Sequence, residues 1–194
     1  MYNYYDNFLE EHIAQLIDFQ IKEVKWQYDY DSKPNGTQKH WHIFCGHNID
    51  ECNLNGYDFI EPIWNNIKNI DSTLELERAY LNAHTYGIEP HIHRDDGDVT
   101  LIYYPRLDWK IDWGGGTAIY TDDVTEIEKH FVNKGNRIIM FDANLPHQAQ
   151  PISRLCFQLR TCIVFKTNRS EEHTSELQSR LQIGCRLLLE KKNK

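Results

Sequence analysis

From Ser72 onward the sequence is a series of short segments rich in β-branched and aromatic residues, and this pattern constrains the fold more than any other feature. The segments read LELERAYLNAHTY, VTLIYYP, GTAIYTD, IEKHFVN, NRIIMFDA, PHQAQPI and CFQLRTCIVFK. Short strands separated by turns in this way are typical of an antiparallel sandwich or barrel. We therefore expect a mainly β (α+β) protein whose core is a jelly roll, or double-stranded β-helix.

The N-terminal part has a different texture. Apolar residues recur at helical spacing from Asp6 to about Val24, with Asp6 as the expected N-cap, and a second short helix is expected from Tyr57 to Ile70. Between them, KWQYDYD and HWHIFCGH flank the turn-forming SKPNGTQ, which predicts a hairpin. The prediction is a single domain over residues 1–168, with helices and a hairpin in 1–75 packed against a jelly-roll core in 76–168.

The C-terminal stretch has a composition of its own. Residues 169–179 read RSEEHTSELQS, which matches one reading frame of a common short-read sequencing adapter codon for codon. The alternative is an amphipathic helix with a leucine face. A match over the whole stretch favours the adapter, so residues 169–194 are interpreted as a translation artefact and excluded from the fold prediction.

Charge and composition exclude several classes of protein. The formal net charge is −8, and residues 169–194 hold more basic than acidic residues, so the rest of the chain is more acidic still. Nucleic-acid binding requires clustered basic residues, and no such partner is expected. The sequence shows neither an apolar run of membrane-spanning length nor a secretory signal, which predicts a cytoplasmic protein without a membrane partner. The five cysteines lack paired spacing and are expected to be reduced thiols. Nothing in the sequence indicates an oligomeric state.

A possible metal site lies in the segment GIEPHIHRDDG. It places His93 and Asp95 two residues apart, so an extended backbone puts both side chains on one face. A third ligand, His147, lies in FDANLPHQAQP, just before another predicted strand. Two imidazoles and one carboxylate on one face leave open positions, the arrangement typical of non-haem Fe(II) oxygenases. His91 is treated as a flanking residue, and Asp96 remains an alternative to Asp95.

An ordered set of motifs gives this site a family context. Taken in order, NAHTYG, the HRD triplet, VTLIYYPRLDW, WGGGT, NRIIMFD, PHQAQP and LRTCIVFK resemble the core strands of the prolyl 4-hydroxylase-like oxygenases that depend on Fe(II) and 2-oxoglutarate. The resemblance covers residues 76–166. It implies that His93, Asp95 and His147 bind Fe(II), that 2-oxoglutarate and O2 are co-substrates, and that ascorbate is a candidate auxiliary cofactor.

The same resemblance implies a reaction. A C–H bond of a substrate, with a prolyl or other peptidyl substrate favoured, would be hydroxylated while 2-oxoglutarate is converted to succinate and CO2. An aspartate among the metal ligands leaves no halide position, which argues against halogenation.

The resemblance also implies a binding site for 2-oxoglutarate. Arg160 resembles the family's arginine, which grips the distal carboxylate through a bidentate pair, and Tyr104 resembles its hydroxyl partner. The interval before Arg160 is a few residues longer than in many family members and contains Arg154, the rival anchor. Arg160 also shares strand parity with Gln158 and Lys166, which would equally suit an ordinary polar outer face.

Other residues have weaker assignments. Asn82 and His84 precede the HRD triplet and are candidates for contact with substrate or co-substrate. The glycines 114–116 would allow a close approach of the backbone to the cleft, although a plain turn fits as well. A second cluster holds residue types that can bind zinc, namely His40, His42, Cys45, His47 and Cys52. Their spacing fits no standard zinc site, so a half-exposed strand is favoured over a metal site.

Two alternative functions stay open. A small-molecule hydroxylase of the same class, acting on a free amino acid or a sugar, would differ only in its substrate. A non-catalytic, cupin-like module would keep the metal ligands and bind metal or ligand without O2 chemistry. The presence of Arg160 and Tyr104 argues against this module, because a degenerate site is expected to lose its co-substrate contacts first.

Overall fold

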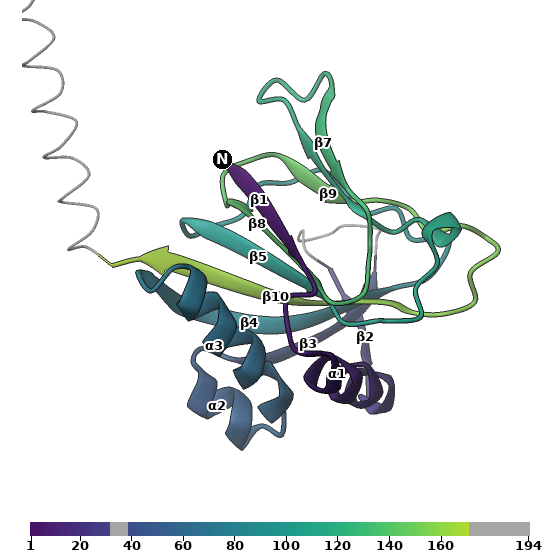
Figure 1. Ribbon diagram of the computed structural model, residues 1–194. Helices are drawn as coiled ribbons and strands as arrows, with labels where there is room; N and C mark the ends of the chain where they lie inside the picture. Colours follow the sequence, from purple (N-terminus) through teal and green to yellow (C-terminus); the bar gives the residue numbers. More distant parts are fainter. Residues whose placement is uncertain (32–38, 171–194) are drawn as a thin grey trace, which may run out of the picture.

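The computed structural model describes residues 1–31 and 39–170 (Figure 1). The strands are β1 (Tyr2–Asp6), β2 (Gln27–Tyr30), β3 (His40–Gly46), β4 (Leu74–His84), β5 (Val99–Tyr104), β6 (Thr117–Tyr120), β7 (Ile127–Phe131), β8 (Arg137–Asp142), β9 (His147–Ala149) and β10 (Arg160–Arg169). The helices are α1 (Glu11–Glu23), α2 (Ile49–Leu54) and α3 (Glu61–Ile70), with 3-10 turns at Asp58–Ile60 and Ile111–Trp113.

The strands form two antiparallel sheets. Within the described residues, the larger sheet has seven strands in the order β1-β8-β5-β10-β4-β3-β2, and the smaller has three in the order β7-β6-β9. Strands that are neighbours in space are far apart in the chain, as in β5-β10-β4, which is the crossover pattern of a jelly roll. The expected mainly β fold is confirmed, and each of the seven segments predicted from the sequence contains one strand, β4 to β10.

Alternation along the central strands separates two apolar clusters. In β5, Leu101 and Tyr103 belong to the cluster on the helical side of the larger sheet, whereas Ile102 and Tyr104 belong to the cluster between the two sheets. Successive side chains of a strand point to opposite faces, and both faces of β5 are covered by apolar clusters, so every residue of β5 is buried. The face toward the smaller sheet is therefore the one that can line an interior site.

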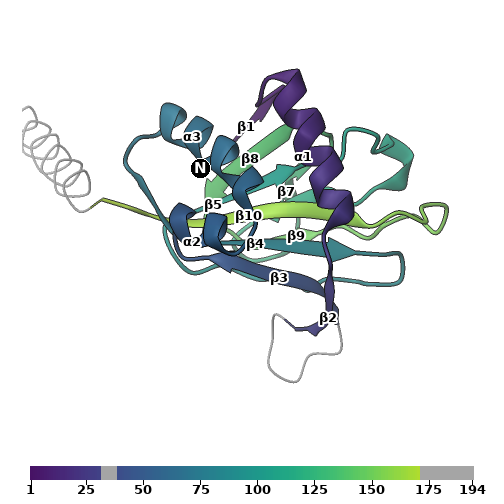
Figure 2. The same cartoon turned by 90° about the horizontal axis from the view of Figure 1, so that it is seen from below.

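The helices cover the other face of the larger sheet. Figure 2, seen from below, shows α1, α2 and α3 on the near side of the larger sheet. In α1, Ala14, Ile17 and Ile21 are buried, and in α3, Ile63 and Ile67 are buried. These spacings of three and four residues place the apolar side chains on one stripe of each helix, which packs on the sheet.

The first predicted helix is wrong at its N-terminus. Tyr2–Asp6 forms β1 beside β8, and α1 begins only at Glu11, with no side-chain cap at Glu10. Asp6 is no N-cap, because Arg137 donates to its carboxylate at 2.6 and 2.9 Å and Lys134 donates at 3.0 Å. These partners lie 128 and 131 residues further along the chain, so local periodicity cannot reveal them.

The second helix prediction corresponds to the 3-10 turn Asp58–Ile60 followed by α3. The short helix α2 was not expected from the sequence. Its N-cap is Asn48, whose side chain accepts a hydrogen bond from the amide of Glu51. The predicted hairpin is confirmed, since β2 and β3 pair antiparallel, while its turn at 32–38 lies outside the described residues.

The final strand reaches the stretch interpreted as an artefact. β10 continues to Arg169, which donates to the Asp71 carboxylate at 3.1 Å, and the amide of Ser170 donates to the Thr73 carbonyl. The described fold therefore extends just past residue 168. Residues 171–194, which contain most of that stretch, lie outside the described residues.

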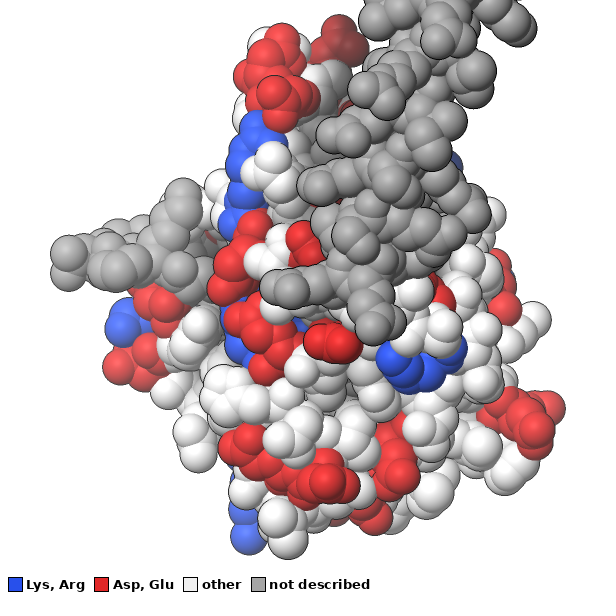
Figure 3. All heavy atoms as spheres, turned by 90° about the vertical axis from the view of Figure 1, so that its left-hand side faces the viewer, with Lys and Arg blue, Asp and Glu red and all other residues white. Residues whose placement is uncertain are grey.

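Surface and composition agree with the sequence in two respects. Acidic side chains predominate over basic ones on the face shown in Figure 3. In the described part of the chain, Cys45, Cys52, Cys156 and Cys162 are buried free thiols.

None of the described helices combines the length and the apolar character needed to cross a membrane.

Asn136 attaches the N-terminal segment to the sheet. Its side chain accepts from the Leu9 amide at 2.9 Å and from the Tyr103 hydroxyl at 3.1 Å, and donates to the Leu9 carbonyl at 2.9 Å. Its φ of 57° lies in the left-handed region, which Asn adopts more readily than most residues.

We predict that Asn136→Ala lowers the free energy of unfolding by about 2–4 kcal/mol, because buried backbone groups of Leu9 lose their partners and alanine is strained at this φ. Chemical denaturation monitored by circular dichroism measures the change. The exposed Asn3→Ala serves as control and should change stability by less than about 0.5 kcal/mol. A loss below about 1 kcal/mol for Asn136→Ala would contradict the anchoring role.

Asp6 predicts an acid-sensitive contribution to stability. The hydrogen bond from Arg137, together with Lys134, lowers the pKa of Asp6 from 3.8 to about 2. Since the folded-state pKa lies below the ordinary value, the stabilisation is present above that value and is lost as the pH falls through about 2.

We therefore expect Asp6→Asn to cost about 1 kcal/mol at neutral pH, allowing for partial solvent screening, and the difference from the native chain to shrink from about pH 4 downward and to disappear only below about pH 2. Urea denaturation of both chains across this range measures it, with exposed Asp112→Asn as the control. A difference that is as large at pH 2 as at neutral pH would show that the carboxylate charge is not its source.

Candidate active site

Two backbone hydrogen bonds bring the predicted metal ligands together. The His93 amide donates to the His147 carbonyl at 3.0 Å, and the His147 amide donates to the His93 carbonyl at 2.9 Å. The Asp95 amide donates to the Ala143 carbonyl at 2.9 Å. The segment between β4 and β5 is thus attached to the turn that leads from β8 into β9, and three side chains from these two segments converge.

The geometry of the three side chains suits one divalent cation. The ligand atoms of His93, Asp95 and His147 all lie within 4.8 Å of one another. His93 Nε2 is 3.6 Å from Asp95 Oδ1, and His147 Nε2 is 3.2 Å from Asp95 Oδ2. No other such group of His, Cys, Asp and Glu is found in the described part of the chain.

Both imidazoles are oriented by their own backbone. Nδ1 of His93 is 2.9 Å from the His91 carbonyl, and Nδ1 of His147 is 2.9 Å from the Leu145 carbonyl. A carbonyl only accepts, so each Nδ1 carries a proton, and Nε2 is the nitrogen of each ring that lies near Asp95. This is the arrangement by which metal-binding histidines are held in position.

Asp95 is ionised in this setting. Burial alone would raise its pKa, but hydrogen bonds and charges from His147 and Lys166 outweigh burial and hold the pKa of Asp95 far below its ordinary value. Burial and the neighbouring His147 lower the pKa of His93, which favours the neutral imidazole. A carboxylate and neutral imidazoles are the protonation states that bind a metal.

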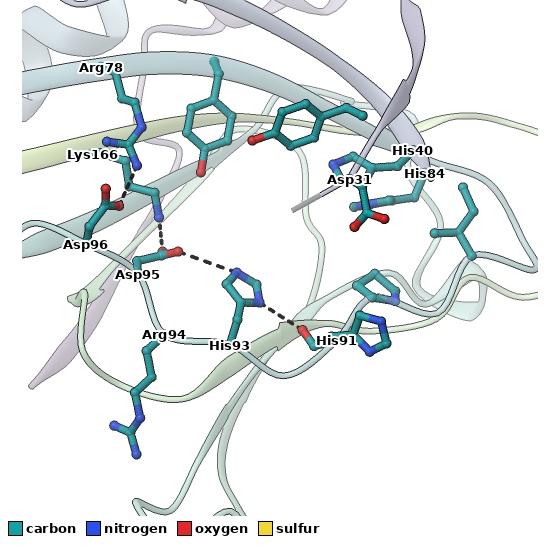
Figure 4. A pocket seen from close by; sticks show the side chains of 14 residues that line it. Asp31, His40, Arg78, His84, His91, His93, Arg94, Asp95, Asp96 and Lys166 are labelled. Atoms are coloured by element: carbon teal, nitrogen blue, oxygen red, sulfur yellow. Dashed lines mark hydrogen bonds and ion pairs between the residues drawn. The ribbon is translucent and has the colours of Figure 1, made fainter. Parts of the chain in front are cut away.

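Two connected cavities adjoin the three ligands. The inner cavity, of about 70 Å³, is lined by His93, Asp95, His147 and Arg160 among others, and so joins the candidate metal site to the predicted 2-oxoglutarate anchor. The outer cavity, of about 470 Å³, shares His93, Asp95 and Lys166 with it. Figure 4 shows the outer cavity, with Lys166 directed at Asp95 and Arg94 directed away.

Arg160 lies at the inner end of this space. It is only 1% exposed, and its guanidinium donates to the Gly115 carbonyl at 2.5 Å and to His84 Nδ1 at 3.3 Å. Among the described residues, no carboxylate forms an ion pair with Arg160, so its charge is buried without an acidic partner. The alternative that Arg160 and Lys166 lie on a polar, solvent-facing side of the sheet is wrong, since both residues are buried.

The backbone near Arg160 depends on glycine. Gly115 has a φ of 72°, and a Cβ built there would lie 3.1 Å from the Cδ atom of Arg160. Glycine therefore allows both the left-handed conformation and the close approach of its carbonyl to the guanidinium.

The structure places Tyr104 one layer behind the cavity. Tyr104 is fully buried, its hydroxyl is 2.7 Å from Thr117 Oγ1, and its ring is 5.7 Å from the guanidinium carbon of Arg160. Thr117 lines the inner cavity, whereas Tyr104 is not among the lining residues. The hydroxyl nearest a bound co-substrate is thus expected to be that of Thr117, with Tyr104 orienting it.

Asn82 and His84 both line the inner cavity from β4. The Asn82 side chain contacts His42 Nδ1 at 2.8 Å. Burial, and then the nearby charge of Arg160, lower the pKa of His84 well below its ordinary value, so a neutral His84 can accept from Arg160.

The rival ligands and the rival anchor are not part of the group formed by His93, Asp95 and His147. Arg154 is exposed in the loop between β9 and β10 and lines neither cavity. Asp96 pairs with Arg78 at 2.5 Å. His91 lines the outer cavity, and its carbonyl orients His93.

The zinc-type ligands of the N-terminal region are not assembled into a site. Cys45 and Cys52 are buried in the apolar cluster beneath the helices, while His47 bonds the Glu77 carbonyl at 3.1 Å. The interpretation as a half-exposed strand with buried thiols agrees with this arrangement.

Three residues at the site were not identified from the sequence as contributors. Thr100 donates to Asp95 Oδ2 at 2.7 Å, Thr117 lines the inner cavity, and Lys166 contacts Asp95. For Lys166, the only sequence feature that indicated a place at the site was its position an even number of residues after Arg160 on the same predicted strand. No sequence feature indicated the two threonines, because hydroxyl side chains are common on buried strands.

Comparisons with solved structures agree on the fold. The protein is similar to a prolyl hydroxylase from Trichoplax adhaerens in complex with a peptide fragment of hypoxia inducible factor, with a TM-score of 0.64, 16% identity, and coverage of 89% of this chain and 86% of that one. It is similar to a prolyl-4-hydroxylase from Pseudomonas putida, with a TM-score of 0.60, 13% identity, and coverage of 87% and 92%.

A third similar structure is HygX from Streptomyces hygroscopicus with nickel and 2-oxoglutarate bound, with a TM-score of 0.59, 6% identity, and coverage of 88% and 83%. No family model and no curated protein matches the sequence. The structural neighbours are 2-oxoglutarate- and Fe(II)-dependent oxygenases, prolyl hydroxylases among them, and this chain has their jelly-roll fold.

The site makes a direct prediction about metal binding. His93→Ala and His147→Ala should each weaken binding of Co(II) by on the order of 100-fold, because each removes one of three protein ligands. His91→Ala is the matched control, since its imidazole lies outside the group, and should bind Co(II) as the native chain does. Isothermal titration calorimetry measures the affinities. Unchanged affinity in both ligand variants would exclude this site.

Proposed function

We propose that this protein is an Fe(II)- and 2-oxoglutarate-dependent dioxygenase that hydroxylates a C–H bond, with release of succinate and CO2. In this proposal His93, Asp95 and His147 hold the metal, and Arg160 binds the distal carboxylate of 2-oxoglutarate. The donor set fits the metal, because two imidazole nitrogens and a carboxylate oxygen lie within 4.8 Å of one another.

The observation that carries the proposal is the buried charge of Arg160. A guanidinium that is 1% exposed and lacks an acidic partner among the described residues is costly, and an incoming carboxylate would offset that cost. The cavity that ends at Arg160 begins at the metal ligands. A small dicarboxylate that places one end on the metal and the other on Arg160 satisfies both ends.

Each group then has a defined task. Bound Fe(II) with 2-oxoglutarate supplies the O2 chemistry. Arg160 holds the distal carboxylate, with Thr117 as a hydroxyl donor positioned by Tyr104. Asn82 and His84 complete the wall of the inner cavity.

A prolyl or other peptidyl substrate is the favoured one, and the outer cavity is the place for it. Its volume, about 470 Å³, accommodates one side chain and its flanking backbone, and it opens directly beside the metal ligands. The similarity to a hydroxylase in complex with a peptide supports this choice. A free small molecule is the second candidate, supported by the similarity to HygX in complex with hygromycin B.

Two further expectations belong to this proposal. The oxygenase domain is assigned to residues 1–168, with β10 continuing to Arg169. A reducing, cytoplasmic location suits the four buried thiols of the described residues.

The test is the visible charge-transfer band that forms when 2-oxoglutarate chelates Fe(II), measured without oxygen on the full chain. We expect a band in the native protein and an affinity for 2-oxoglutarate at least tenfold lower in Arg160→Met, because the charge-assisted pair is lost. Arg154→Met is the matched control and should behave as the native chain.

Absence of the band from folded, iron-loaded native protein would contradict the proposal and favour the non-catalytic, cupin-like module. A band lost in Arg154→Met and kept in Arg160→Met would move the anchor to the loop. Succinate formation in the presence of proline-containing peptides, compared with free amino acids and sugars, then decides between the two substrate classes.

A further inference from the structure

Lys166 is a buried cation in direct contact with a candidate metal ligand. Its side chain is 2% exposed, lines both cavities, and places its ammonium group on Asp95 Oδ2 (Figure 4). A purely structural role would be filled at lower cost by an apolar side chain, because burying an ammonium group requires a compensating partner.

Sheet register explains how Lys166 reaches Asp95. Lys166 on β10 is paired with Thr100 on β5, so both side chains lie side by side on the face toward the cavity. Thr100 donates to Asp95 Oδ2 at 2.7 Å, and Lys166 donates to Thr100 Oγ1 at 3.2 Å. Two donors, one neutral and one charged, therefore hold the same carboxylate oxygen.

The other oxygen of Asp95 is left for the metal. Oδ1 has no hydrogen-bond donor among the described residues, and its nearest recorded neighbour is His93 Nε2 at 3.6 Å. Thr100 and Lys166 contact Oδ2, which also lies 3.2 Å from His147 Nε2, so Oδ1 is the oxygen of Asp95 that would be free to bind a cation. One-oxygen binding keeps a further coordination position open.

We propose that Lys166 is a positioning residue that holds Asp95 for one-oxygen binding and weakens Asp95 as a metal donor, an inference that rests on the proposed metal site. The two donors then act in opposite directions. Thr100 orients the carboxylate without adding charge, so it favours metal binding. Lys166 orients the same oxygen but draws charge from Asp95 and repels the incoming cation, so its net effect is to reduce metal affinity.

The consequence is a more electron-poor metal centre. A carboxylate that shares its charge with an ammonium group donates less to the metal. The metal then keeps more positive charge for binding an anionic co-substrate. Lys166 thereby lowers the affinity for the metal and raises the affinity of the metal-loaded site for the co-substrate.

Titration of the full chain with Co(II) alone tests the proposal. We expect Lys166→Met to bind Co(II) about tenfold more tightly than the native chain, and Thr100→Val to bind it about tenfold more weakly. Lys166→Gln is a second neutral variant that keeps a polar group, and it should also bind more tightly. Lys166→Arg keeps the charge and should restore near-native affinity. Circular dichroism verifies that each variant is folded.

A spectroscopic readout separates the electronic effect from a structural one. With Fe(II) and 2-oxoglutarate, the charge-transfer band of Lys166→Met or Lys166→Gln should move to longer wavelength, because a stronger carboxylate donor makes the metal more electron-rich. A merely structural lysine would leave the band position unchanged.

Equal or weaker Co(II) affinity in the folded neutral variants, or an unmoved band, would overturn the role of Lys166 while leaving the metal site intact. Failure of the native chain to bind Co(II) would overturn both this role and the proposed function. Opposite signs for the lysine and threonine variants are the expected result.

Discussion

The backbone pairing of His93 with His147 is the interaction on which the site depends. Two hydrogen bonds between these residues, with the bond from Asp95 to Ala143, connect the segment after β4 with the turn before β9. Without this pairing the three candidate ligands would belong to two separate segments, whose relative positions are costly to fix. Within it, each histidine is further oriented by a carbonyl two residues earlier in its own segment.

The second constraint is the burial of two cations on one face of β10. Arg160 and Lys166 are separated by six residues, so strand alternation places both toward the cavity. The two buried charges differ in how they are compensated. Lys166 has an internal partner in Asp95, whereas Arg160 has none among the described residues, and this difference assigns them different tasks. In the proposals made above, Lys166 positions the candidate ligand Asp95, and Arg160 binds the carboxylate of an incoming anion.

Much of this architecture could be predicted from the sequence, and the exceptions share a cause. Strands β4 to β10 follow from alternation and turn residues, and the ligands follow from the spacing of His93 and Asp95. The assignment of Asp6 as a helix cap was wrong because its partners, Lys134 and Arg137, lie 128 and 131 residues further along the chain. The place of Thr100 at the site likewise depends on the register between β5 and β10, which no local pattern encodes.

The sequence by itself determined the class of fold and the chemical types available to the site, because periodicity and residue type are local properties. Tertiary structure decided which candidates meet. It placed Asp95 with the two histidines and Asp96 with Arg78, and it buried Arg160 while leaving Arg154 in solvent. The physical reason is that burial and charge pairing are properties of neighbours in space, and in a jelly roll those neighbours come from strands far apart in the chain.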